Sequence, residues 1–300
     1  MLIITSVTFI KIPNKYICSK FQNTQYHKIC WFIQHAESGG FNQRKYHTVF
    51  FGSSQCYYGI NDSILGIDYL NLGMNTPSSD LDFYMKEKFV KSGGESNNFV
   101  QVIGGGKVVS FGLHPLMPFL VKPNWLIRNG QSFCSLHFLK YLINRFQTVC
   151  DYIFWQSLRK HEELNQFKRE YGVGYLDVVT MKRQLKPKKI NDMEYLTYLD
   201  KNSVNFVDEF LHNVKSQWNF LEKNEGLGQI RFLMIPKFQT VNAMVLDLNN
   251  IQSFNSDFTL IRTDYTKLGC LVSDSIFWAD QGHLNRKGSL LYTRLVSELF

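Results

Sequence analysis

Residues 47–62 read HTVFFGSSQCYYGIND, and this stretch carries the clearest fold signal of the chain. Its first five residues are mostly β-branched or aromatic and lead into Gly52, which is typical of a buried strand that enters a tight turn. Two serines, Ser53 and Ser54, follow the glycine directly. The order of strand, glycine and serine predicts a turn that lifts a hydroxyl group out of a sheet.

Strand-like and helix-like segments alternate along the rest of the chain. The other expected strands are 65–72, 107–113 (KVVSFGL), 229–235 (QIRFLMI) and 257–261. The expected helices are 79–91, two within 132–168, 204–223 and 286–299. This alternation predicts an α/β fold with a mostly parallel sheet covered on both faces, whose ligands bind at the carboxyl ends of the strands.

The simplest division of the chain is an N-terminal appendage, residues 1–45, followed by one domain, residues 46–300. A polar stretch near 169–205 is expected to be an insertion in that domain. The first ten residues, MLIITSVTFI, are apolar but shorter than the about 20 residues that a spanning helix needs. A buried first strand, the remnant of a membrane anchor and a weak export signal all fit them, so membrane association through the N-terminus stays open.

Composition argues against several classes of function. The net charge of +8 favours anionic partners, but no helix-turn-helix, zinc-finger or RNA-binding signature accompanies it, so no nucleic-acid partner is expected. Six cysteines are widely spaced without any Cys-x-x-Cys or Cys/His cluster, which argues against a metal site. The glycines at 104–106 are followed by Lys107 and Val108 and therefore lack the P-loop pattern. We expect neither a metal nor a cofactor.

A second motif lies near the end of the chain, where residues 276–291 read IFWADQGHLNRKGSLL. Asp280 precedes His283 by three residues, and an aspartate at this spacing can hold the Nδ1–H of the imidazole while Nε2 stays free to accept a serine proton. Asn285 is a natural cap for the last helix, which would fix the position of His283. Each motif alone is weak, but together they predict a triad of Ser54, His283 and Asp280.

With these motifs the chain resembles the SGNH/GDSL hydrolase superfamily. The blocks that carry the resemblance are FGSSQCYYGI, NLGMNTPSSD and FWADQGHLNRKG, and the similarity covers roughly residues 46–300, with the middle third alike in rhythm only. The subgroup most alike reads Gly-Ser-Ser, and many of its members belong to bacterial cell-envelope and polysaccharide loci. The resemblance implies a three-layer α/β/α fold with a flavodoxin-like sheet and a place in the cell envelope or periplasm, with the cytoplasm left open.

The resemblance also implies roles for single residues. Ser54 corresponds to the nucleophile, His283 to the general base and Asp280 to the acid that orients it. The backbone N–H groups of Ser54 and Gly73 correspond to the oxyanion hole, into which Asn75 could also reach.

One family block is missing from its usual place. The family's third block, Gly-x-Asn-Asp, supplies an asparagine donor to the oxyanion hole, but the only such run here is 59–62, too close to Ser54. At the end of the expected third strand, His114 could replace the donor, and an ordinary structural histidine fits equally well. The resemblance therefore implies either an esterase or an O-acyltransferase that acts on acyl esters, above all acetyl esters, of a carbohydrate or cell-envelope polymer. The alternative is an inactive glycan-binding or polysaccharide-assembly protein of the same fold.

Overall fold

The computed structural model describes residues 7–22, 24, 26–75, 79–104, 114–128, 135–158, 230–235, 259–261, 271, 274–280 and 282–298. The expected strand 107–113, the helix 204–223 and the insertion near 169–205 lie outside the described residues. Residues 7 and 8 are helical, so the described end of the first apolar run does not form a strand.

Five parallel strands form one sheet in the order β2-β1-β3-β4-β5. Their bounds are β1 (Lys45–Gly52), β2 (Tyr69–Asn71), β3 (Glu95–Gly104), β4 (Ile230–Ile235) and β5 (Thr259–Ile261). Phe50 of β1 pairs with Asn71 of β2, and Gly52 of β1 pairs with Val102 of β3. The carboxyl ends of these three strands therefore lie side by side, and the α/β class with a parallel sheet is confirmed.

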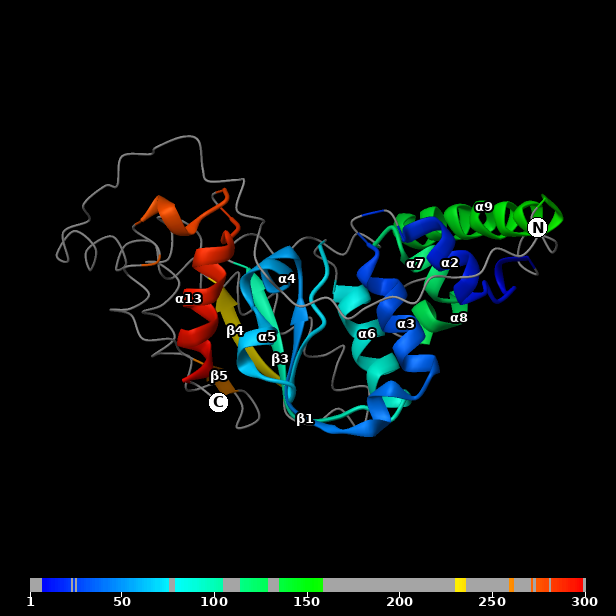
Figure 1. The fold of residues 1–300 in the computed structure, drawn as a ribbon. Coiled ribbons are helices and arrows are strands. Elements are labelled where there is room, and N and C mark those ends of the chain that lie inside the picture. Colours follow the sequence, from blue (N-terminus) through cyan, green and yellow to red (C-terminus); the bar gives the residue numbers. More distant parts are fainter. Residues whose placement is uncertain are drawn as a thin grey trace.

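Helices flank the sheet, with α3 and α6 on one side of β1 and α4, α5 and α13 on the other (Figure 1). The helical bounds are α2 (Asn14–Phe21), α3 (Lys28–Glu37), η1 (Gly40–Gln43), α4 (Ser54–Gly59), α5 (Asp62–Leu65), α6 (Ser79–Lys91), α7 (Met117–Leu120), α8 (Pro123–Arg128), α9 (Leu136–Leu158), η4 (Ser275–Phe277) and α13 (Arg286–Ser297). Side chains of β1 alternate between these sides, because Val49 and Phe51 join one apolar cluster and Phe50 joins the other. Within the described part of the chain, no helix is both long and apolar enough to cross a bilayer.

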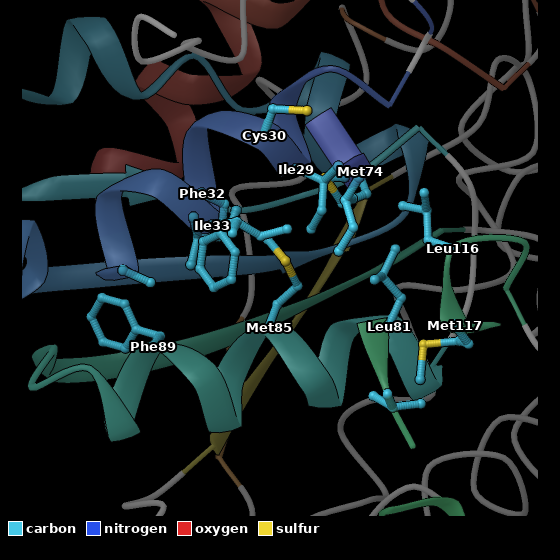
Figure 2. Close-up of a cluster of buried hydrophobic side chains, with 14 of the residues drawn as sticks. Ile29, Cys30, Phe32, Ile33, Met74, Leu81, Met85, Phe89, Leu116 and Met117 are labelled. Atoms are coloured by element: carbon cyan, nitrogen blue, oxygen red, sulfur yellow. The ribbon is translucent and has the colours of Figure 1, made fainter. Parts of the chain in front are cut away.

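The larger apolar cluster includes the N-terminal helices. Figure 2 shows side chains of α3, among them Phe32 and Ile33, close to Met85 and Phe89 of α6, with Met74 nearby. The same cluster contains buried residues of α2 and β1. The predicted boundary between an appendage and a domain at residue 45 therefore does not coincide with a gap in the core.

The strand β3 was not predicted. It runs over Glu95–Gly104, before the expected strand 107–113, and its buried polar side chains interrupt the apolar pattern that indicates a strand. Gln101 donates to Asp82 Oδ2 at 2.8 Å and accepts from Lys86 Nζ at 2.7 Å, so its burial depends on partners from α6. The region 132–168, where two helices were expected, contains the single helix α9 in its described part.

Candidate active site

The turn after β1 places Ser54 at the start of a helix. Gly52 has a φ of 147°, and a Cβ there would lie 2.5 Å from the carbonyl oxygen of Val102, so this close approach of β1 to β3 requires glycine. Ser53 is extended and precedes α4, and Ser54 is the first residue of that helix. The N–H of Ser54 is therefore one of the helix-terminal donors that have no acceptor within the helix.

The loop that carries His283 is closed by an isolated bridge between Trp278 and Leu284. Within it, the N–H of Ala279 donates to the carbonyl of His283 at 2.9 Å. Trp278 is fully buried, and its Nε1–H donates to the carbonyl of Leu271 at 2.7 Å. Trp278 thus anchors the loop in the core.

Asn285 caps α13, as predicted, and also holds the loop that carries His283. The side chain of Asn285 accepts from the N–H of Gly288 at 3.0 Å and donates to the carbonyl of Ile276 at 2.7 Å. A Cβ on Gly288 would lie 2.0 Å from the carbonyl oxygen of Phe277, so glycine lets the helix pack directly on the loop. The position of His283 relative to the N-terminus of α13 is therefore fixed.

The three predicted triad residues meet in one hydrogen-bonded row. Ser54 Oγ lies 2.8 Å from His283 Nε2, and His283 Nδ1 lies 2.9 Å from each carboxylate oxygen of Asp280. A carboxylate only accepts, so Nδ1 carries the hydrogen and Nε2 is left to accept from the serine hydroxyl. This is the arrangement in which a histidine can remove a serine proton.

The environment of Asp280 keeps the carboxyl ionised. Partial burial acts to raise the pKa of Asp280, but hydrogen bonds from the His283 ring and from the N–H groups of Gly282 and His283 outweigh it, so this pKa lies below its ordinary value. The Asp280 side chain is 54% exposed and that of His283 is 24% exposed. The hydrogen-bonded side chains of the triad are therefore accessible to solvent and to a substrate.

Further contacts join the acid–base loop to the nucleophile helix. Gln55, the residue after the serine, donates from Nε2 to the carbonyl of Gly282 at 3.0 Å. The ring of Tyr58 meets the His283 ring edge-on, with the ring centres 5.9 Å apart. Neither contact could be predicted from the sequence, in which both residues are notable only because they are near Ser54.

The loop after β2, which contains Gly73, lies against α4. A Cβ on Gly73 would lie 2.7 Å from Cys56 Cβ. The N–H of Gly73, however, donates to Asn71 Oδ1 at 2.8 Å, so an oxyanion role for it would require this hydrogen bond to be shared or broken. Asn75 lies two residues further on and is half-buried. The N–H of Ser54, by contrast, lies at the start of α4, where it has no acceptor within the helix.

No role was predicted for Asn71, but its hydrogen bonds connect several parts of the site. Its Nδ2 donates to the carbonyl of Cys56 at 2.9 Å and to that of Ile60 at 2.7 Å. Its N–H donates to Asp62 Oδ2 at 2.9 Å, so the early run 59–62 has structural contacts. Asn71 thus fastens the end of β2 to the nucleophile helix.

His114 is buried away from the triad. It is 2% exposed, its Nδ1 accepts from the N–H of Leu116 at 3.1 Å, and its ring meets that of Tyr26 edge-on. Burial lowers the pKa of His114 to about 4, so the ring is neutral at pH 7. Among the described residues, none of its hydrogen bonds or ring contacts is to the triad. In the sequence, Gly105, Gly106 and Lys107 follow β3, so no asparagine stands directly after the third strand.

The described residues contain no group of three or more His, Cys, Asp or Glu side chains that could hold a metal ion. A scan against protein-family models found no match, and searches of the curated proteins and of the solved structures found no similar protein.

Proposed function

We propose that the chain is a serine esterase or O-acyltransferase of the SGNH type, with a three-layer α/β/α fold. The observation that carries the proposal is the 2.8 Å contact between Ser54 Oγ and His283 Nε2, side chains that are 229 residues apart in sequence. Asp280 on the far side of the imidazole completes the order of groups that acyl transfer needs.

The proposed reaction has two halves. His283 Nε2 takes the proton of Ser54 as its oxygen attacks the acyl carbonyl, and the N–H of Ser54 faces the oxygen that becomes negative. His283 then gives the proton to the departing alkoxide, which leaves an acyl-enzyme. Water or an acceptor hydroxyl attacks this ester, His283 takes the proton of the attacking group, and Ser54 regains it when the acyl group leaves.

The proposed substrate is an acyl ester, above all an acetyl ester, of a carbohydrate or cell-envelope polymer. This part rests on the resemblance of the sequence blocks, since a fold does not fix a substrate. An inactive glycan-binding or polysaccharide-assembly protein is the second candidate. It is favoured by the hydrogen bond that occupies the N–H of Gly73 and by the lack of an asparagine directly after β3.

The test is turnover of p-nitrophenyl acetate by the wild type and by Ser54→Ala, His283→Ala and Ser53→Ala. Ser53 is the matched control, because it is the neighbouring serine and its side chain makes no capping hydrogen bond to α4. We expect the first two variants to lose at least about a thousandfold in kcat/KM and the control to stay near the wild type. An inactive wild type would favour the binding protein, and activity that survives in Ser54→Ala would refute the triad.

A further inference from the structure

Lys28 is a buried lysine of the N-terminal helices that contacts residues close to Ser54. It begins α3 and is only 2% exposed, although lysine is almost never fully buried unless it is paired. Its Nζ donates to the carbonyl of Gly73 at 3.0 Å and lies 4.9 Å from the centre of the Tyr57 ring. Tyr57 is one helical turn after Ser54, and Gly73 lies against α4, so these two contacts bring Lys28 close to the nucleophile helix.

The hydrogen bond from Lys28 continues to the nucleophile turn. The peptide group that accepts from Lys28 at the Gly73 carbonyl donates through the N–H of Met74 to the carbonyl of Gly52 at 2.9 Å. Gly52 is two residues before Ser54. The peptide between Gly73 and Met74 is thus held at both ends, by Lys28 on one side and by the nucleophile turn on the other.

The position of Lys28 is fixed by apolar packing. Ile29, which follows it in α3, lies close to Met74 in the cluster of Figure 2. The side chain therefore approaches the loop after β2 from a packed helix.

The positive charge of Lys28 affects the electrostatic environment of α4. Burial raises the pKa of the Cys56 thiol, and Lys28 acts against this rise. Cys56 is two residues after Ser54, so a positive charge at Lys28 also favours negative charge that develops near the nucleophile. Fixed positive groups aimed at a developing oxyanion are among the largest contributions to acyl-transfer catalysis.

We propose that Lys28 is a positioning residue for the reaction of Ser54, which holds the loop after β2 against the nucleophile turn and supplies positive charge behind the oxyanion. This inference rests on the proposed function. In this role Lys28 makes the N-terminal helix α3 part of the catalytic unit. Its charge also supplies electrostatic stabilisation in a chain that has no asparagine directly after β3.

The test compares Lys28→Met, Lys28→Gln and Lys28→Arg with the control Lys20→Met. Lys20 is exposed and also lies over an aromatic ring, that of Tyr16, at 5.5 Å, so it matches Lys28 in its ring contact. A fluorophosphonate probe titrates the fraction of protein with a reactive serine, and kcat and KM for p-nitrophenyl acetate are then expressed per labelled site.

For Lys28→Met we expect kcat per labelled site to fall roughly 10- to 100-fold, with KM changed much less, and we expect Lys28→Arg to recover most of the loss. Lys28→Gln keeps a donor without the charge, so its kcat per labelled site should lie between those of Lys28→Met and Lys28→Arg. If Lys28→Met does not fold, Lys28→Gln takes its place in the comparison. A purely structural role would lower the labelled fraction and leave kcat per labelled site unchanged, and that result overturns the inference alone. A wild type that is neither labelled nor active overturns the proposed function and this inference with it.

Discussion

Replacing Asp280 with asparagine should slow the reaction without unfolding the loop. Asp280 Oδ1 accepts from the N–H of Gly282 at 2.7 Å and from that of His283 at 2.9 Å, and an amide oxygen can keep both bonds. The variant loses the charge that faces His283 Nδ1, and its amide nitrogen puts a donor where Oδ2 accepts from Nδ1. A hydrogen bond to a charged group contributes roughly 1.5–3 kcal/mol, which corresponds to a fall in kcat/KM of roughly 10- to 150-fold. Because the Asp280 side chain is 54% exposed, water shares its role, and we expect the lower end of this range.

The assay is kcat/KM for p-nitrophenyl acetate at pH 8, with Asp274→Asn as the matched control. Asp274 is an exposed carboxylate in the same region, and its side chain accepts from the N–H of Ile276 at 2.9 Å, away from the triad. The control should retain the wild-type rate. If Asp280→Asn stays within twofold of the wild type, or falls no further than Asp274→Asn, the orienting role of Asp280 is refuted.

Two further predictions concern stability. Asp80 is buried, its Oδ2 has no hydrogen-bond partner among the described residues, and burial raises its pKa from 3.8 to about 6. Since the folded-state pKa lies above the ordinary value, stability is lost as the pH rises through about 6. Asp80→Asn should therefore raise Tm at pH 8, by the equivalent of at most about 3 kcal/mol, and leave it little changed at pH 4. A lower Tm at pH 8 would contradict the destabilising effect of burying this carboxylate. Gly52→Ala forces a Cβ to within 2.5 Å of the Val102 carbonyl oxygen and should lower the free energy of unfolding by roughly 2–4 kcal/mol in urea titrations, so an unchanged midpoint would count against the tight turn.

Elements with strong local patterns could be predicted from the sequence. The expected helix 79–91 has the same bounds in the structure as α6, and the ends of β1, β4, β5 and α13 lie within two residues of their predicted positions. Each has an apolar run or helical repeat bounded by a turn or capping residue. The pairing of Ser54 with His283 could be proposed because each residue stands in a short motif at the end of a strand or the start of a helix.

Elements stabilised by distant partners could not be predicted. In β3, Gln101 is buried because Asp82 and Lys86 of α6 satisfy its amide, and nothing near Gln101 in sequence signals those partners. The contact between Lys28 and Gly73 joins residues 45 positions apart, and neither lies in a motif that suggests the other. Such pairs depend on how α3 and α6 pack on the sheet.

The measurement that tests the central claim most directly is the mass of the intact protein after reaction with a fluorophosphonate, followed by mapping of the modified peptide. We predict one adduct per chain, located on Ser54, which is lost in Ser54→Ala and His283→Ala and retained in Ser53→Ala. An adduct on another residue, or no adduct on protein that is folded, would contradict the assignment of Ser54 as a nucleophile activated by His283.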